Sequence, residues 1–317
     1  MSPSAQPPPP RVAFLGPPGT FTEEALLSQA DLAEGELVPI RSIVEVIAAV
    51  EAGEAELGIV PIENAIEGSV NLTLDTLGFE TDPHKVLIQR EVVLAISLNL
   101  CAKPGTPMSA IRSVVSMPHA VAQCREWLAA KLPGVEVAAA NSTAEAAQQV
   151  ARARGSGRAA ISTALAARLY GLEVLAGDVE DHPENQTRFV VLGRGIPART
   201  GHDKTSIVVF QSQDRPGSLL AILQEFAARA VNLTKLESRP TKRGLGNYCF
   251  FIDCEGHISD ELVADVLRNL AAKHSVKFLG SYPVEGGGEG EARRRAAGKA
   301  WKAATTWVDD LRRQVHE

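Results

Sequence analysis

The sequence predicts an α/β protein in which a large, mainly parallel α/β region is followed by a smaller βαββαβ domain. The length of 317 residues is about twice the ~150 residues expected for one domain. From residue 11 to about residue 195, short apolar runs alternate with segments of helical periodicity, which is typical of a mainly parallel sheet. From 204 to 284 the order becomes strand, helix, two strands, helix, strand, as in a ferredoxin-like sandwich.

Each element follows from the local pattern. In the first region we expect strands at 12–15, 37–40, 57–60, 86–98, 113–115, 135–139, 159–161 and 189–192, and helices at 22–32, 43–51, 120–131, 143–153 and 163–170. Residues 1–10 form a Pro-rich head and residues 196–203 a polar linker. In the second region, strands are expected at 205–210, 233–238, 248–253 and 276–282, and helices at 217–229 and 260–273. Residues 285–317 are expected to form a flexible linker and an amphipathic tail helix.

Composition excludes several classes of protein. The net charge of −6 argues against nucleic-acid binding over the whole chain, and 45% apolar residues indicate a globular protein with a core. No stretch reaches the ~20 apolar residues of a membrane helix, and the N-terminus lacks the pattern of a secretory signal. The four cysteines, Cys101, Cys124, Cys249 and Cys254, have neither CxxC nor metal-ligand spacing. We therefore expect buried thiols, a cytoplasmic protein and no metal site. The alternative is that one of the cysteines is catalytic.

The first polar motif, Gly16-Pro17-Pro18-Gly19-Thr20-Phe21, directly follows a predicted strand. It lacks the Lys-Ser/Thr of a phosphate loop, and no GxGxxG lies at a strand–helix junction, so no nucleotide cofactor is predicted. Thr20 and Glu23 match a capping box. The segment is therefore either a capped helix alone or a helix start whose amides hold a carboxylate.

The second motif, Val60-Pro61-Ile62-Glu63-Asn64, places Asn64 where a strand ends. Open α/β sheets bind ligands at this edge, and an amide side chain offers both a donor and an acceptor. Asn64 is therefore a candidate ligand-binding residue, the alternative being a residue that serves a local turn.

The third motif runs from Ser116, at the end of a predicted strand, to Gln123 in the following helix. Seven residues separate them, so Gln123 lies on the same face as the helix start and both can face one cleft. His119 between them is either an acid or a cap or surface residue.

The fourth motif is Asn185-Gln186-Thr187-Arg188-Phe189, which leads into a strand. Thr187 can donate a hydrogen bond and Arg188 can form a bidentate pair with a carboxylate. The alternative is a strand start with an ordinary surface arginine.

Together these motifs resemble the prephenate dehydratase family over residues 11 to about 195, in order and spacing. Residues 204–284 resemble an ACT regulatory domain, whose two effector motifs match Arg215-Pro216-Gly217-Ser218-Leu219 and Glu237-Ser238-Arg239-Pro240. The resemblance implies a catalytic domain of two lobes similar to those of type II periplasmic binding proteins. Related sequences commonly carry His at Met117 and Gln at His119, so no histidine is expected to be catalytic.

The resemblance also implies an activity and its site. Prephenate loses CO2 and hydroxide to give phenylpyruvate, a carbon–oxygen lyase reaction that needs no cofactor or metal. Thr187 would donate to the departing hydroxyl, Arg188 would pair with a carboxylate or brace the loop, and Glu63 is the alternative acid. The other implied substrate-contacting residues are Asn64, Ser116, Gln123, Phe189, Gly19, Thr20 and Phe21.

The ACT resemblance implies a second site and an assembly. Phenylalanine would bind at Gly217, Ser218 and Leu219 together with 237–240, and Ser218 would cap the helix there. A homodimer or homotetramer is implied. Two rival functions remain, dehydration of arogenate and a non-catalytic module that binds an anion and senses an amino acid; a binder would not require Thr187, Asn64 and Gln123 together.

Overall fold

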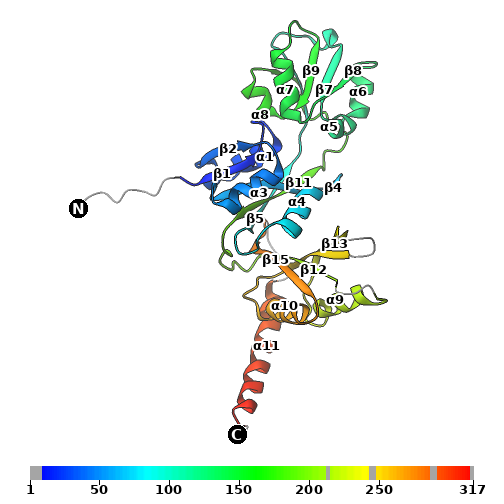
Figure 1. Ribbon diagram of the computed structural model, residues 1–317. Helices are drawn as coiled ribbons and strands as arrows, with labels where there is room; N and C mark the ends of the chain where they lie inside the picture. The colour runs from blue at the N-terminus through cyan, green and yellow to red at the C-terminus, as the bar shows by residue number, and fades with distance from the viewer. Residues whose placement is uncertain (1–8, 212–214, 243–247, 286–290, 315–317) are drawn as a thin grey trace, which may run out of the picture. The chain divides into compact units, whose positions relative to one another are not determined.

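The computed structural model of the chain describes residues 9–211, 215–242, 248–285 and 291–314 (Figure 1). The chain forms two compact units. The first unit comprises Met1–Thr76 and Val92–Val191, and the second comprises Leu77–Glu91 and Leu192–Glu317. The expected head lies outside the described residues, apart from its last two positions.

The first lobe of the first unit is built on a sheet with the strand order β2-β1-β3-β11-β5. Its strands are β1 (Arg11–Leu15), β2 (Glu36–Ile40), β3 (Leu57–Asn64), β5 (Leu87–Ala95) and β11 (Gln186–Gly193), and the short β4 (Gly68–Ser69) pairs with β3. β1 pairs in parallel with both β2 and β3, as expected for strands joined by helices. The unit boundaries fall within β5 and β11.

Helices cover both faces of this sheet. On one face, α1 (Phe21–Leu27) and α2 (Ala30–Ala33) pack through Leu26 and Leu32 onto Val12, Phe14 and the strands beside them. On the other face lies α3 (Ile43–Ala52). A Cβ at Gly58 would lie 2.8 Å from Val50 Cγ2, so only glycine lets β3 approach α3 this closely. After β4 the chain forms α4 (Asn71–Asp75) and a π-helical turn at Thr76–Glu80.

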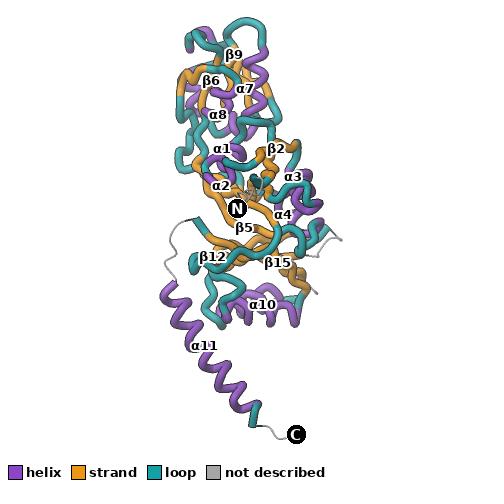
Figure 2. Tube along the Cα trace, turned by 90° about the vertical axis from the view of Figure 1, so that its left-hand side faces the viewer, coloured by secondary structure: helices purple, strands orange, loops and turns teal. Residues whose placement is uncertain are grey.

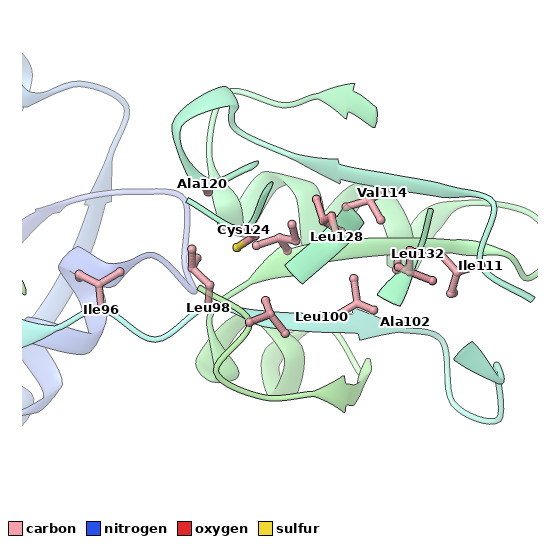
Figure 3. Packing of buried hydrophobic residues seen from close by; sticks show 13 residues of the cluster. Ile96, Leu98, Leu100, Ala102, Ile111, Val114, Ala120, Cys124, Leu128 and Leu132 are labelled. Atoms are coloured by element: carbon pink, nitrogen blue, oxygen red, sulfur yellow. The ribbon is translucent and has the colours of Figure 1, made fainter. Parts of the chain in front are cut away.

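The second lobe has the strand order β10-β6-β9-β7-β8. Its strands are β6 (Asn99–Ala102), β7 (Ser113–Ser116), β8 (Glu136–Ala139), β9 (Arg158–Ser162) and β10 (Glu173–Ala176), and a 3-10 turn lies at Met108–Ala110. Successive side chains alternate between the two faces, so Val114 and Val115 of β7 enter different clusters. Val114 packs with α5 (Pro118–Ala122) and α6 (Arg125–Lys131), as Figure 3 shows. Val115 packs against α7 (Thr143–Arg152) and α8 (Ala164–Leu169).

The two lobes are joined through the loop that precedes α1. Thr163 Oγ1 donates to Gly19 O over 2.7 Å, and Tyr170 Oη donates to Pro18 O over 2.6 Å. Gly19 has a φ of +93°, and a Cβ there would lie 2.9 Å from Ala166 Cα, so both backbone conformation and space require glycine. The amide of Leu165 donates to Glu24 Oε1 over 3.2 Å. Desolvation by burial raises the pKa of this glutamate above its ordinary value, although the Leu165 amide opposes the shift.

The second unit contains the predicted βαββαβ domain. Its strands β12 (Asp203–Phe210), β13 (Leu233–Pro240), β14 (Tyr248–Glu255) and β15 (Ser275–Pro283) form an antiparallel sheet with the order β13-β14-β12-β15. Helices α9 (Ser218–Ala227) and α10 (Glu261–Lys273) cover one face through Phe226 and Leu270. Figure 2 shows α10 beside the strands β12 and β15. The ferredoxin-like order expected from the sequence is therefore confirmed.

The other face of this sheet is covered by Leu77–Glu91, a segment distant in sequence. The Phe79 ring packs edge-on against Phe251 with centroids 6.3 Å apart, and Lys204 Nζ lies 2.7 Å from Glu91 Oε2. Both partners of this ion pair are nearly fully buried. The sequence analysis assigned residues 77–91 to the first region because chain order cannot show which sheet a segment packs against.

The final helix, α11 (Glu291–Arg312), follows the linker predicted after the βαββαβ domain. The sequence places Trp301, Ala304, Val308, Leu311 and Val315 on one stripe of this helix. Val308 and Leu311 are exposed, and Val315 lies outside the described residues. Across the described parts of the chain, no helix is both long and apolar enough to cross a membrane.

Element boundaries differ from the sequence predictions at specific points. The run 86–98, expected as one strand, is β5 in the first lobe, and the following β6 belongs to the second sheet. An apolar run remains apolar when the chain crosses between two buried sheets, so periodicity cannot locate the crossing. The expected helices 22–32 and 120–131 are each two short helices, since Ser28 ends α1 and Cys124 separates α5 from α6.

Glu24 provides a test of the contact between the lobes. Its raised pKa means that, between its ordinary pKa and the raised one, the folded protein holds a proton that the unfolded chain has lost. The free energy of unfolding therefore falls as pH rises through this interval. We expect Glu24→Gln to match the wild type at about pH 4 and to exceed its stability at about pH 7, in urea unfolding monitored at several pH values. Exposed Glu54→Gln is the control and should follow the wild type; a Glu24→Gln curve parallel to wild type would contradict this account.

Candidate functional site

A cavity of about 1020 Å³ lies between the two lobes of the first unit. The first lobe contributes the loop after β1, the start of α1, Arg41, and the ends of β3 and β11. The second lobe contributes α5 and the first turns of α7. All four sequence motifs reach this cavity through lining side chains. The first contributes Thr20 and Phe21, the second Asn64, and the fourth Thr187 and Phe189. The third motif contributes Met117, His119 and Gln123.

Asn64 is the centre of the hydrogen bonding in the cavity. Its Oδ1 accepts from the backbone amides of Ile66 and Glu67, each over 3.0 Å. Backbone amides can only donate, so these two bonds fix which end of the Asn64 side chain is oxygen. The Nδ2 atom then donates to Asn185 Oδ1 and to Thr187 Oγ1, each over 2.9 Å.

This orientation determines what Thr187 can do. Its Oγ1 accepts from Asn64, so its own O–H proton is left to donate. Among the described residues, no acceptor is recorded for that proton, and the side chain faces the cavity. Thr187 therefore presents a hydrogen-bond donor, held in place by Asn64, to whatever occupies the cavity.

The hydrogen bonds continue from Asn185 to the second lobe. Asn185 Nδ2 donates to Gln123 Oε1 over 3.0 Å, and Gln123 Nε2 donates to Glu67 Oε1 over 3.2 Å. The other oxygen of Glu67 lies 3.1 Å from His119 Nδ1. Asn185 is almost fully buried, and the sequence analysis quoted it in the fourth motif without naming it as a site residue. Asn185 lies two residues before Thr187, and this spacing in the motif could have identified it as a site residue.

Arg188 and Glu63 lie away from the cavity. Arg188 Nη2 is 3.0 Å from Glu63 Oε2, and neither residue lines the cavity. Each follows or precedes a lining residue on its strand, and neighbouring side chains on a strand point to opposite faces. Of the two roles expected for Arg188, this position fits bracing.

Ser116 and Gly19 also lie outside the cavity lining. Ser116 is fully buried at the end of β7, and its Oγ donates to Ile161 O over 2.7 Å. Gly19 donates its amide to the carboxylate of Glu23. Thr20 caps α1 as predicted, with its Oγ1 3.4 Å from Glu23 N. The capping box therefore uses an amide that the sequence analysis had offered to a substrate carboxylate.

Arg41 is a cavity residue that the sequence analysis did not identify. It directly follows β2, in a stretch with no polar motif, so only the three-dimensional structure brings it to the site. Among the described residues it is the only lysine or arginine lining the cavity, whose other charged side chains are Glu67, Glu145 and, when protonated, His119. The start of α7, from Asn141 to Thr143, was likewise not identified.

Neither the cysteines nor any cluster of metal ligands forms a reactive centre within the described ranges. The four cysteines are buried and none forms a disulfide within the described residues. Burial raises the pKa of the Cys101, Cys124 and Cys254 thiols to about 12. In the parts of the chain that the structure describes, no three His, Cys, Asp or Glu side chains come together as a metal site.

The second unit has its own cavity, of about 490 Å³, at the start of α9. Gly217, Ser218, Leu219 and Ser238 line it, whereas Glu237, Arg239 and Pro240 do not. Glu237 instead forms ion pairs with Lys235 and Arg239, at 3.4 and 3.3 Å.

The expected cap of α9 is wrong in one detail. Gly217, with a φ of +86°, occupies the N-cap position, and the Ser218 hydroxyl bonds back to Arg215. Glycine is favoured there because the backbone is left-handed.

Known proteins were compared with this chain. Residues 12–196 match the family description "Prephenate dehydratase" and residues 206–272 match "ACT domain". A prephenate dehydratase of Mycolicibacterium vanbaalenii is 47% identical over 291 residues, covering 87% of this chain and 91% of that protein. The solved structure of the Arthrobacter aurescens prephenate dehydratase in complex with L-Phe has a TM-score of 0.85 at 38% identity. The match covers 96% of this chain and 99% of that chain.

A third protein shares the fold but has a different description. The structure of GqqA, described as a novel type of quorum quenching acylase, has a TM-score of 0.76 at 28% identity, covering 87% of this chain and 98% of that one. Similarity of fold alone therefore does not select one activity. The match over the whole first region and the high identity to curated relatives do select a family: the chain belongs to the prephenate dehydratases, with an ACT domain following the catalytic region.

Proposed function

We propose that this protein is a prephenate dehydratase that converts prephenate to phenylpyruvate and is regulated by phenylalanine through its ACT domain. The observation that carries the proposal is the Thr187 hydroxyl, which Asn64 orients as a donor into a cavity that could hold a small organic anion. Family membership supplies the substrate class.

The reaction is an elimination across the ring. The bond between the ring and its carboxylate breaks and releases CO2, and the electron pair passes through the ring and expels the hydroxyl group on the opposite carbon. The hydroxyl leaves with the bonding pair and takes up a proton to become water. Aromatisation of the ring supplies the driving force, so the protein's task is to orient the substrate and stabilise the charge that develops on the departing oxygen.

The cavity residues fit these two tasks. Thr187 donates to the departing oxygen, where a preorganised neutral donor stabilises developing negative charge. Phe21, Phe189, Ile96 and Leu98 provide an apolar wall, in which a carboxylate is poorly solvated and its loss as neutral CO2 is favoured. Asn64 and Asn185 act as positioning residues through their bonds to Thr187 and Gln123.

We assign the donor role to Thr187 rather than to Glu63. The Glu63 carboxylate lies 3.0 Å from the Arg188 guanidinium and does not line the cavity. Arg188 is then a brace for the β3–β11 pair.

The rival activities have less support in the cavity. An acylase needs an activated nucleophile, and in the described part of the chain no lining hydroxyl is hydrogen-bonded to the one lining histidine, His119. Arogenate differs from prephenate by an ammonium group in place of the keto group. Assaying turnover of each compound directly shows which of them is the substrate. A module that only binds an anion would turn over neither substrate.

For regulation we propose that phenylalanine binds in the cavity at the start of α9, bounded by Gly217, Ser218, Leu219 and Ser238. The effector shifts activity only if it binds one arrangement of the protein more tightly than the other. Leu220 and Tyr248, which line this cavity and are exposed in the single chain, support a homodimer or homotetramer that pairs ACT domains. Four buried cysteines that form no disulfide within the described residues support a cytoplasmic location.

The catalytic role of Thr187 is tested by removing its hydroxyl. Thr187→Ala is expected to lower kcat by about 10²- to 10³-fold, the effect of losing one preorganised donor. Thr187→Ser keeps the hydroxyl and should retain most of the activity. Phenylpyruvate formation from prephenate and from arogenate is the measurement. Wild-type turnover by Thr187→Ala would remove Thr187 from the mechanism, and no wild-type turnover of either substrate would remove the enzyme assignment.

The effector site is tested by filling the cavity of the second unit. Ser238→Phe places a large side chain there and is expected to abolish the change in prephenate turnover that phenylalanine causes in the wild type. The readout is the ratio of rates with and without phenylalanine. Exposed Arg268→Gln, on α10 and outside this cavity, is the control and should keep the wild-type ratio. An unaltered ratio in Ser238→Phe would place the effector elsewhere.

A further inference from the structure

Arg41 is an exposed residue that lines the cavity between the two lobes. It follows β2, whose last residue Ile40 pairs with Leu15 of β1. The amide of Gly16 donates to Ile40 O over 2.8 Å, so Arg41 lies beside the loop that leads into α1. No hydrogen bond or ion pair of the Arg41 guanidinium is recorded among the described residues. A cation that lines a cavity without a protein anion is available to an anionic ligand.

The first turn of α7 faces the same cavity from the second lobe. Asn141, Ser142 and Thr143 line it, so the N-terminus of the ten-residue helix, where the first backbone amides have no partner within the helix, borders the cavity. Gln148 of this helix donates to Tyr170 Oη over 3.2 Å, and Tyr170 donates to Pro18 O. The helix therefore adjoins the same loop as Arg41.

Two largely buried threonine side chains border the cavity at this place. Thr22 is only 4% exposed and Thr143 only 5%, and both line the cavity. Within the described residues, neither hydroxyl has a recorded hydrogen-bond partner. Neither oxygen is among the fully buried side-chain atoms that lack a partner in the described residues, so both hydroxyls are open to the cavity and available to a polar group that occupies it.

The carboxylate of Glu145, which also lines the cavity, already has hydrogen-bond partners. Glu145 Oε2 accepts from the Asn141 amide over 3.0 Å, and Oε1 accepts from Gln149 Nε2 over 3.3 Å. Its backbone amide donates to Ser142 Oγ over 3.0 Å. Glu145 thus forms the capping box of α7, and its charge is compensated by the helix start.

The position along the sheet indicates which substrate group is held. In the order β2-β1-β3-β11, Arg41 follows β2 and Thr187 lies in β11, three strand spacings or about 14 Å apart at the backbone. In prephenate the departing hydroxyl and the pyruvyl side chain lie on opposite carbons of the ring. The ring carboxylate is attached to the same carbon as the pyruvyl side chain, but the pyruvyl carboxylate lies two carbon atoms farther out. With the hydroxyl at Thr187, the pyruvyl carboxylate is therefore the group that reaches farthest toward Arg41.

We propose that Arg41, the hydroxyls of Thr22 and Thr143, and the first turn of α7 bind the pyruvyl carboxylate of the substrate. This inference rests on the proposed function. It makes Arg41, rather than Arg188, the residue that neutralises a substrate carboxylate. The carboxylate that leaves as CO2 is then left in the apolar part of the cavity.

The test uses two ligands that differ in the ring carboxylate. Prephenate carries both carboxylates, whereas phenylpyruvate keeps only the pyruvyl one. Arg41→Gln is expected to raise the KM for prephenate and the inhibition constant of phenylpyruvate together, each by about 10- to 100-fold, with a much smaller change in kcat. Arg41→Lys should fall between Arg41→Gln and the wild type. Thr143→Val, which removes the hydroxyl and keeps the shape, should raise both constants by about 3- to 10-fold.

Controls separate this role from a structural one. Arg154→Gln removes an exposed arginine of the same unit outside the cavity and should leave both constants unchanged. Added guanidinium at low concentration should partly restore the affinity of Arg41→Ala, which a general loss of structure would not allow. An increase for prephenate alone would show that Arg41 holds the ring carboxylate and would overturn the proposal, as would no increase for either ligand.

Failure of the proposed function is recognised separately. Calorimetric binding of phenylpyruvate to the wild type and to Arg41→Gln requires no turnover. If the wild type does not convert prephenate but binds phenylpyruvate in an Arg41-dependent manner, the carboxylate site stands and the proposed reaction fails. Binding that is the same in both proteins overturns the carboxylate site itself.

Discussion

The catalytic cavity depends on the two backbone amides that hold the Asn64 side chain. Ile66 and Glu67 donate to Asn64 Oδ1, so the side-chain nitrogen must point toward Asn185 and Thr187. Each later group in the series then has its donor and acceptor ends determined in turn. The turn at 65–67, directly after β3, thereby sets the donor and acceptor direction of the whole hydrogen-bond chain. This chain extends to Gln123 in the second lobe.

Strand geometry distributes the remaining roles. Thr187 and Phe189 face the cavity because they are two residues apart on β11, and Arg188 between them faces Glu63. A charged pair thus supports the sheet from outside while a neutral donor and an aromatic wall form the site. This arrangement suits an elimination that is driven by aromatisation, because neutral dipoles stabilise the departing oxygen without a permanent charge.

In a weakly acidic chain, binding of the proposed dianionic substrate requires local positive potential. Net charge is −6, and the cavity is also lined by Glu67 and Glu145. Both carboxylates have partners: Gln123 and His119 for the first, and the start of α7 for the second. Among the described residues that line the cavity, Arg41 therefore remains as the positively charged side chain without a carboxylate partner.

The sequence by itself determined the alternation of strands and helices, the βαββαβ domain, and the four polar motifs, because periodicity and capping are local properties. It also singled out Thr187, Asn64 and Gln123, which the structure brings into one hydrogen-bonded chain. Only the tertiary structure decided that Arg188 and Ser116 turn away, that Arg41 and α7 enter the cavity, and that residues 77–91 pack on the second unit. These outcomes depend on which face a side chain takes and which sheets become neighbours, and contacts between residues distant in the chain leave no local pattern.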